Sequence, residues 1–358
     1  MHLRKGRQGA VIGCNTGMDM NPADGILQIG KIPNTLLYEL VIRKMTPNNG
    51  RALLPAGIGE DFGALDFGEE ACVVAGDPVT GATKFTGKTA VHVACNDIAT
   101  CGVKPIAILT TLLLPPGTTR AELGALADEI AQTAKALGVS VIGGHTEVTD
   151  AVTRTVISVT AIGAAKKNAY ITTGGAGAGD TLIMTKGAAL EGAALIAAEK
   201  EAELAARFGA DFVERAKRLS DDISVVADGV AAGGAGAKAM HDATEGGVYG
   251  AAWEMAEASG RGVEIYREMI YVPDEAREIC DYFGIDAYRL ISSGCMLIAT
   301  DSPDKMISTL QGAGIPAVAI GKFLADPAER KICCGNAVIP LEQPGPDELY
   351  KVINQNSV

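Results

Sequence analysis

The chain has 358 residues, of which 47% are hydrophobic and 21% are charged, and its formal net charge is −12. This composition is typical of a globular protein, and the length allows two domains. The acidic balance argues against general binding to a nucleic-acid backbone, and the sequence has no apolar run of about 18 residues that predicts a membrane span.

Eight cysteines are scattered along the chain without the paired C-x2-C spacing of a zinc site. A chain with this much apolar sequence does not need a disulfide framework, so we expect free thiols in a reducing cytoplasm. The first residues include several basic side chains but only a broken apolar segment, and we do not interpret them as a signal peptide. The sequence therefore predicts a cytoplasmic protein.

After an irregular extension at residues 1–29, apolar spacing predicts alternating helices and strands in the first half of the chain. Leucines at helical spacing favour a helix at 32–45, with Pro33 in its first turn. The other expected elements of this half are a strand at 71–75, a helix at 88–101, a strand at 106–114, a helix at 119–137, and strands at 139–142 and 154–162. This order is typical of a mixed α+β protein rather than a strict βαβ series.

The glycine-rich run GGAGAG at 174–179 is the best candidate for a domain boundary. We expect a first domain at residues 30–170 and a second domain at 176–340. The second is predicted to contain a strand at 181–185, a helix from 189, a long helical region at 201–230 and shorter elements beyond. The polar segment 341–358 is expected to be a fraying tail.

Four aspartates share one setting, because each lies at the end of an apolar segment and close to glycine. They are Asp61 in GEDFG, Asp77 in VVAGDP, Asp97 in CNDIATCG and Asp242 in HDATEGG. Such carboxylates can converge on Mg²⁺, which prefers a few carboxylate oxygens together with waters and phosphates. A nearby glycine such as Gly59 lets the backbone approach a phosphate closely. Each aspartate taken alone also suits a helix N-cap or a turn.

Asn96 and Asp97 lie inside an otherwise apolar helix. Both are costly to bury there unless they are paired or bound to a ligand, and a solvent-facing turn of the helix is the alternative. The run GGAGAGD at 174–180 resembles a phosphate loop only superficially, since it lacks the terminal Lys-Ser/Thr of a P-loop. We interpret that run as a linker and a turn.

The segment GGHTEV follows a predicted strand and carries a third group of candidate ligands. The glycines Gly143 and Gly144, with Thr146, can cradle a phosphate or a sugar, and Glu147 can hold a metal or a hydroxyl group. His145 is a candidate general base, with a structural hydrogen bond as the alternative role.

Taken in order, these motifs resemble the aminoimidazole ribonucleotide (AIR) synthase superfamily. This superfamily also includes selenophosphate synthetase, thiamine-monophosphate kinase and the hydrogenase-maturation protein HypE. The resemblance covers roughly residues 30–335, and its motifs are GIGEDFGALDFG, VVAGDP, CNDIATCGVKP, GGHTEV and HDATEGGVYGA. It implies an N-terminal α/β domain whose strands build a dimer barrel, and a C-terminal α+β domain packed beside it.

The resemblance also implies a homodimer that binds ATP with Mg²⁺ and activates an oxygen of a small-molecule substrate by phosphorylation. By position, Asp61, Asp97 and Asp242 would hold the metal and the triphosphate, with Asp77 in support. Asn96 would orient Asp97 or contact phosphate. Because unpaired like charges repel, Asp61→Asn is expected to leave the stability of the nucleotide-free protein level or slightly raised.

Within the superfamily the chain looks most like HypE, through GKIPNTLLYEL, GDPVTGA and GGHTEV. HypE ends in a cysteine, whereas this chain ends in NQNSV and its last cysteine is Cys334. HypE tends to place an acid before the glycine of a late strand, and this chain has Ser293 there. Both differences count against a cyanide-forming role. The alternatives are a kinase of the thiamine-phosphate type and a nucleotide-binding maturation partner that does not turn over ATP.

Overall fold

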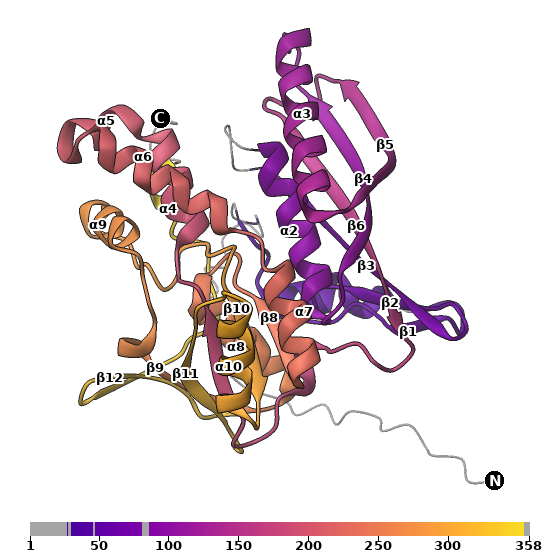
Figure 1. Ribbon diagram of the computed structural model, residues 1–358, viewed down its shortest axis with the longest axis vertical. Coiled ribbons are helices and arrows are strands. Elements are labelled where there is room, and N and C mark those ends of the chain that lie inside the picture. The colour runs from indigo at the N-terminus through magenta and orange to yellow at the C-terminus, as the bar shows by residue number, and fades with distance from the viewer. Residues whose placement is uncertain (1–26, 28–29, 46, 81–85, 354–358) are drawn as a thin grey trace.

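The computed structural model describes residues 27, 30–45, 47–80 and 86–353, and these residues form two β-sheets that lie in separate halves of the molecule (Figure 1). The mixed α and β architecture with two parts agrees with the fold class expected from the sequence. The expected extension at residues 1–29 lies almost wholly outside the described residues.

The first half contains a six-stranded sheet in the order β1-β2-β3-β6-β4-β5, in which the β4–β5 pair is parallel. Its elements are α1 (Asn34–Leu40), η1 (Ile42–Lys44), β1 (Ala52–Leu54), β2 (Gly63–Asp66), β3 (Glu70–Val79), α2 (Thr86–Thr100), β4 (Pro105–Leu114), α3 (Arg120–Leu137), β5 (Ser140–Val148) and β6 (Val156–Lys166). The order from β3 to β6 is the strand-helix-strand-helix-strand-strand order expected from the sequence.

Helix α3 illustrates how local sequence sets these boundaries. Thr119 accepts a hydrogen bond from the backbone N–H of Glu122, whose carboxylate accepts one from the backbone N–H of Thr119 in return. This capping box begins the helix, and Gly138 ends it in the left-handed conformation that glycine adopts at low cost.

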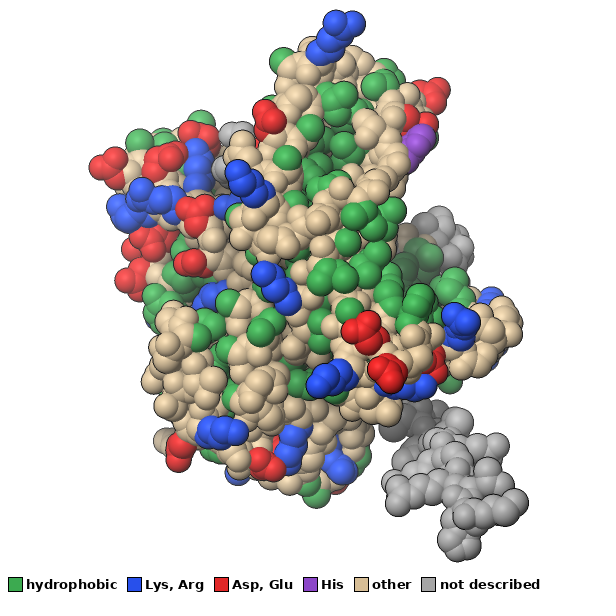
Figure 2. Space-filling view, turned by 45° about the vertical axis from the view of Figure 1, so that its right-hand side comes forward, with side chains coloured by type: hydrophobic (Ala, Val, Ile, Leu, Met, Phe, Trp, Pro, Cys, Tyr) green, Lys and Arg blue, Asp and Glu red, His purple; other side chains and the backbone are tan. Residues whose placement is uncertain are grey.

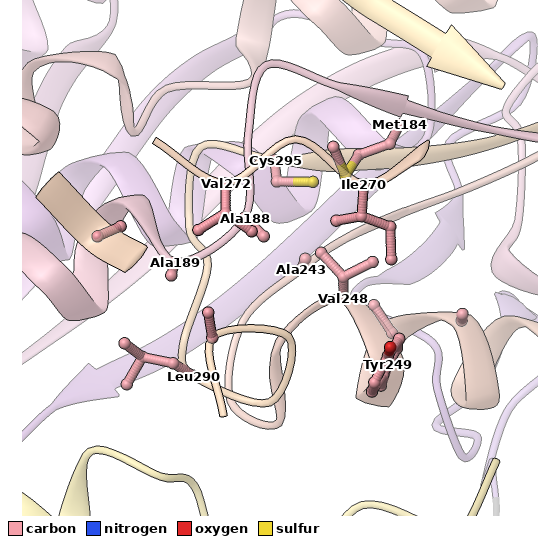
Figure 3. Close-up of a cluster of buried hydrophobic side chains, with 14 of the residues drawn as sticks. Met184, Ala188, Ala189, Ala243, Val248, Tyr249, Ile270, Val272, Leu290 and Cys295 are labelled. Atoms are coloured by element: carbon pink, nitrogen blue, oxygen red, sulfur yellow. The ribbon is translucent and has the colours of Figure 1, made fainter. Parts of the chain in front are cut away.

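The second half contains a seven-stranded sheet in the order β13-β12-β9-β11-β7-β10-β8. Its elements are η2 (Thr173–Gly175), β7 (Thr181–Thr185), α4 (Leu190–Glu199), α5 (Glu201–Phe208), α6 (Ala210–Arg218), η3 (Leu219–Asp222), α7 (Val226–Ala235), β8 (Ala239–Asp242), α8 (Gly247–Ser259), β9 (Gly262–Tyr266), η4 (Arg267–Met269), α9 (Asp274–Phe283), β10 (Met296–Thr300), α10 (Pro303–Gly312), β11 (Ala317–Leu324), β12 (Arg330–Cys334), β13 (Ala337–Pro340) and α11 (Tyr350–Ile353). Apolar side chains from its strands, helices and loops, including Met184, Val248 and Ile270, pack into one core (Figure 3).

Three expectations about local structure were wrong. The region 201–230 is not one long helix but α5, α6, η3 and the first half of α7, because Gly209 at positive φ separates α5 from α6 and the chain turns before α7. The segment GGHTEV lies within strand β5 rather than in a loop after it. The described part of the polar tail is packed rather than frayed, since Leu341, Leu349 and Val352 are buried in the second core.

Helix α2 joins the two halves. It covers β3 and β6 of the first sheet and also packs against α7 and β8 of the second half. Apolar residues of both halves therefore form one continuous cluster, in which Ile98 of α2 lies with Val73 of β3 and Met240 of β8. Full burial of a side chain of this size is worth about 2 kcal/mol, so this shared core fixes the two halves relative to each other.

The contact between α2 and α7 depends on glycine. An added Cβ at Gly229 would lie 2.1 Å from the carbonyl oxygen of Ala99, whereas one at Gly234 of the same helix would meet nothing within 4 Å. We expect Gly229→Ala to lower the free energy of unfolding by about 2–4 kcal/mol because backbone must move, and Gly234→Ala to raise it by about 0.5–1 kcal/mol through helix propensity. Urea denaturation of both variants measures this, and equal effects would contradict the close packing of these helices.

Candidate active site

The four aspartates singled out from the sequence come from different elements of both halves. Asp61 lies in the loop before β2, Asp77 in β3, Asp97 in α2 and Asp242 at the end of β8. The side chains of Asp77 and Asp97 are hydrogen-bonded to each other, and Asp97 also lies within electrostatic range of Asp61 and Asp242. The structure therefore brings all four carboxyl groups into one site, although they are far apart in the sequence.

Asp61, His241 and Asp242 form the tightest part of this site, since ligand atoms from all three lie within 4.8 Å of one another. His241 Nδ1 lies 2.7 Å from Asp61 Oδ2, and His241 Nε2 lies 3.0 Å from Glu254 Oε2. Lys31 Nζ in turn donates to Glu254 Oε1 at 3.0 Å. The result is a row of alternating charges that runs from Asp61 to Lys31.

This row holds Asp61 in place through a charged imidazole. Burial opposes protonation of His241, but Asp61 and Glu254 outweigh it and raise its pKa well above the usual value. Burial likewise opposes ionisation of Glu254, but His241 and Lys31 lower its pKa to about 2. Because both ring nitrogens face carboxylate oxygens, both carry protons and donate hydrogen bonds. The sequence led us to expect that Asp61→Asn leaves the stability of the nucleotide-free protein level or slightly raised. The geometry argues instead for a loss of stability, because the substitution removes the charged partner of a buried imidazolium.

The remaining carboxyl groups resist ionisation together. Burial, followed by the charges of Asp242, Asp77 and Asp61, raises the pKa of Asp97 well above its usual value. Burial and then Asp61 raise the pKa of Asp242 to about 8. Burial also raises the pKa of Asp77. A cation placed among these groups would favour their ionised forms and relieve the repulsion.

The donor set fits Mg²⁺. The buried Oδ2 of Asp242 has no hydrogen-bond partner, which leaves a carboxylate oxygen available in the site. Both nitrogens of His241 are taken by carboxylates, so the ring orients Asp61 and leaves coordination to oxygens. Mg²⁺ prefers a few carboxylate oxygens with waters and phosphates. Asp61 and Asp242 offer such oxygens within 4.8 Å of each other, and Asp97 lies nearby, within electrostatic range of both.

The loop that carries Asp61 is anchored to the second half. Gly59 has a φ of 75°, and an added Cβ there would lie 3.2 Å from the carbonyl oxygen of Glu254. Glu60 accepts a hydrogen bond from the backbone N–H of Thr173. The structure thus gives Gly59 a packing contact with α8, and its expected contact with a nucleotide stays a prediction.

Asn96 is fully buried, and both ends of its amide bond to backbone. Its Nδ2 donates to the carbonyl oxygen of Ile223 at 2.8 Å, and its Oδ1 accepts from the N–H of Val225 at 2.8 Å. These bonds tie α2 to the turn before α7, immediately beside Asp97. They explain why an amide is buried in an apolar helix, and they hold α2, and with it Asp97, against the second half.

In a single copy of the chain, the candidate ligands of GGHTEV lie far from the four aspartates. Asp77 on β3 and Gly144 on β5 lie on the same line across the sheet, because Asp77 pairs with Val159 of β6, Val159 with Thr110 of β4, and Thr110 with Gly144. Three strand spacings of about 4.8 Å therefore separate Asp77 from Gly144. An added Cβ at Gly144 would lie 1.8 Å from the carbonyl oxygen of Thr110, so close strand pairing requires this glycine. All of β5 is exposed, including Gly143, Gly144, His145, Thr146 and Glu147.

His241, Glu254 and Lys31 were not among the residues predicted from the sequence. The signal for His241 was its position immediately before Asp242 in the motif HDATEGG. Glu254 and Lys31 left no comparable signal, because each depends on a contact between segments more than 200 residues apart or on the packing of α8 against β8.

A cavity of about 730 Å³ lies next to the four aspartates, between the two halves of the molecule. Asp77 and Lys31 line it from the site already described. Glu191 and Ser293 line it from the second half. Its volume is in the range of small-molecule binding sites in proteins.

Comparison with known families identifies the class of the protein. The family described as AIR synthase related protein, N-terminal domain, matches residues 59–165, and the corresponding C-terminal domain family matches residues 177–333. The chain belongs to the AIR synthase related family, as its motifs suggested.

Among curated relatives, the chain is 29% identical over 286 residues to a hydrogenase expression/formation protein of Methanocaldococcus jannaschii, covering 77% of this chain and 81% of the relative. It is 28% identical over 266 residues to the carbamoyl dehydratase HypE of Escherichia coli, covering 73% of this chain and 76% of the relative. The protein is therefore a HypE-like member of the family.

Known structures share the fold. HypE in a crystallised HypE–HypF complex matches with a TM-score of 0.71 at 20% identity, over 86% of this chain and 99% of the other. HypE in complex with ATP matches with a TM-score of 0.62 at 18% identity, over 89% and 96% of the two chains. ThiL complexed with AMPPCP and TMP matches with a TM-score of 0.68 at 18% identity, over 84% and 93%. At these identities the likeness establishes the two-domain fold.

The raised carboxyl pKa values predict how stability depends on pH. The pKa of Asp242 is raised from the usual 3.8 to about 8 in the folded protein. Between these two pH values the folded state therefore binds more protons than the unfolded state. Stability is therefore expected to fall by up to about 5 kcal/mol as the pH rises from 4 to 8, with His241 acting in the same direction. Added Mg²⁺ should reduce this fall, and Asp242→Asn should flatten it.

Urea denaturation at pH 5 and pH 8, with and without Mg²⁺, measures these effects. The matched control is Asp281→Asn, which changes an exposed aspartate on α9 and should leave the pH dependence unchanged. A pH dependence that is the same in Asp242→Asn as in the unaltered protein would contradict the assignment of a buried, repelling carboxyl cluster.

Proposed function

We propose that the protein is a Mg²⁺- and ATP-dependent enzyme that transfers a phosphoryl group to an oxygen of a small acceptor molecule. The observation that carries this proposal is the convergence of Asp61, Asp97 and Asp242 from three separate segments, with pKa values of Asp97 and Asp242 raised by burial and by one another. Such a cluster is costly unless a cation occupies it. Similarity to HypE in complex with ATP supports ATP as the anionic partner of that cation.

In this proposal each residue of the site has a role. Asp61, Asp97 and Asp242 hold Mg²⁺, which supplies charge neutralisation for the triphosphate. Asp77 shares a hydrogen bond with Asp97 and thereby orients its carboxyl group. Asn96 fixes the adjacent turn of α2, so its role in the reaction is to position Asp97 rather than to touch the nucleotide.

We also propose a homodimer. Apolar side chains gather on the exposed face of the first half (Figure 2). On β4 and β5 the exposed large ones are Ile106, Leu109, Val141, Ile142 and Val148. A second copy on this face would cover them and would leave the unpaired edge of β5 out of water. It would also give Gly143, Gly144, Thr146 and Glu147 a place beside the nucleotide of the partner, which they do not have within one chain.

Two alternatives stay open within this family. Similarity to ThiL complexed with AMPPCP and TMP supports a small-molecule kinase. Similarity to HypE in its complex with HypF supports a nucleotide-binding maturation partner. Release of phosphate or phosphorylated product from ATP separates an enzyme from such a binding partner. We further propose a cytoplasmic location, which suits the seven free cysteines among the described residues.

Charge-removing variants test the metal and nucleotide assignment. We expect Asp97→Asn and Asp242→Asn to weaken Mg²⁺-dependent ATP binding by at least tenfold, because each removes a carboxylate that counters the cation. Asp128→Asn on the exposed surface of α3 is the control and should bind as the unaltered protein does. Calorimetric titration of ATP with and without Mg²⁺ gives the affinities, and full Mg²⁺-dependent affinity in both site variants would overturn the proposal.

A further inference from the structure

The segment 222–225, which joins η3 to α7, supports the helix that carries one of the proposed metal ligands. From residue 223 onward this segment forms neither helix nor strand. Its backbone bonds to both ends of the Asn96 amide, through one carbonyl oxygen and one N–H. Asp97 is the next residue of α2, so its position depends on where the segment 222–225 lies.

The same segment also contacts the loop before β10. Gly294 of that loop has a φ of 106°, and an added Cβ there would lie 2.6 Å from the carbonyl oxygen of Asp222. The residue after Gly294 accepts a hydrogen bond from the N–H of Ala243, which directly follows Asp242. The segment 222–225 therefore contacts structure beside two of the proposed metal ligands.

Three successive carbonyl groups of this segment receive hydrogen bonds from side chains. A buried irregular backbone has no ladder of its own, so its carbonyl groups need other donors. Asn96 donates to the carbonyl oxygen of Ile223 at 2.8 Å. The ammonium group of Lys186 donates to the carbonyl oxygens of Ser224 and Asp222, at 2.5 and 3.4 Å. The segment is thus held by two side chains, one from α2 and one from the turn after β7.

An ion pair holds the ammonium group of Lys186 over this segment. Its Nζ lies 3.2 Å from Oδ2 of Asp228, in the first turn of α7. The Asp228 side chain is only 1% exposed and that of Lys186 is 18% exposed. An ammonium group has three N–H donors, and here they face two backbone carbonyls and one carboxylate. The contacts of Lys186 therefore fix both the segment and the start of α7.

The backbone at Lys186 shows that its side chain is what this position requires. Lys186 has a φ of 53°, a conformation that glycine adopts freely and other residues adopt at a cost. Glycine would suit the turn better, so the contacts of the ammonium group account for the lysine. Residues held in such conformations by surrounding contacts are concentrated at functional sites.

We propose that Lys186 is a positioning residue for the metal site, which holds the segment 222–225 so that Asn96 can place Asp97. The inference rests on the proposed function, since it assumes that Asp97 helps to bind the metal ion. Lys186 acts through backbone carbonyl groups and through Asn96. Side chains that support metal ligands in this way typically change metal affinity by about 10–100-fold when they are replaced.

The experiment measures the Kd of the full chain for Mn²⁺ in the presence of AMPPCP, from the electron paramagnetic resonance signal of the free ion. Replacing Lys186 alone would leave Asp228 as a buried unpaired charge, so the test variant combines Lys186→Met with Asp228→Leu. We expect this variant to raise the Kd for Mn²⁺ about tenfold.

The matched control removes a second lysine–aspartate pair at the other end of β7. Lys238 Nζ lies 2.8 Å from Oδ1 of the buried Asp180, which immediately precedes that strand. The combination of Lys238→Met with Asp180→Leu should bind Mn²⁺ as the unaltered protein does. Melting curves establish that each variant is folded at the temperature of the titration. Lys186→Arg replaces a test variant that does not fold, and should also weaken Mn²⁺ binding, because a planar guanidinium cannot reproduce the three donors of one ammonium group.

A second background separates positioning from a general loss of structure. If Lys186 acts through Asp97, the Lys186 substitution made in Asp97→Asn should raise the Kd for Mn²⁺ by less than about twofold further, because effects that act through one group are not additive. A general loss of structure would weaken binding equally in both backgrounds.

The outcomes distinguish this inference from the proposed function. Failure of the unaltered protein to bind Mn²⁺ with AMPPCP would count against the proposed function itself. If the unaltered protein binds Mn²⁺, then an unchanged Kd in the Lys186 variant would overturn the positioning role. An equal loss with and without Asp97→Asn, or an equal loss in the Lys238 control, would overturn it as well.

Discussion

Mutual repulsion among buried carboxyl groups is the constraint on which the rest of this structure depends. Asp61, Asp77, Asp97 and Asp242 share one site, and burial and neighbouring charge raise the pKa values of three of them. Asp61 faces an imidazolium, that of His241, which is held in turn by Glu254. The site thus contains one carboxylate, that of Asp61, which is held in place by His241. The other three carboxyl groups repel one another and would be stabilised in their ionised forms by a cation. This arrangement suits the binding of a metal ion together with an anionic nucleotide.

Keeping these groups together requires rigid support from both halves. Helix α2 supplies Asp97, covers the first sheet and packs against α7 and β8. Asn96 ties the same turn of α2 to the segment before α7, and Gly229 allows the helices to approach closely. The loop with Asp61 is anchored through Gly59 and Glu60 to the second half. Much of the polar and glycine content of the motifs serves this support rather than contact with a ligand.

The sequence predicted the parts of the molecule that depend on local pattern. Apolar spacing located α2, α3, β4 and β6 closely. The position of four aspartates at the ends of apolar segments, each close to glycine, singled them out. The sequence did not predict residues whose place in the site depends on contacts between distant segments of the chain. Lys31 and Glu254 are connected over more than 200 residues, and the buried oxygens of Glu191 and Ser293 reflect the fit of one loop against one helix. GGHTEV was expected to follow a strand that ended at Ile142, with its glycines free to contact a ligand, but close strand pairing at Gly144 uses the same residue type.

The central claim is that the carboxyl groups from both halves bind one metal ion together with a nucleotide. A crystal structure grown with Mn²⁺ and AMPPCP, with anomalous scattering collected for manganese, tests it most directly. We expect a manganese peak within about 2–2.5 Å of carboxylate oxygens of Asp61, Asp97 or Asp242, with the triphosphate on its open side. A nucleotide bound elsewhere, or a site in which these carboxyl groups contact no metal, would contradict it.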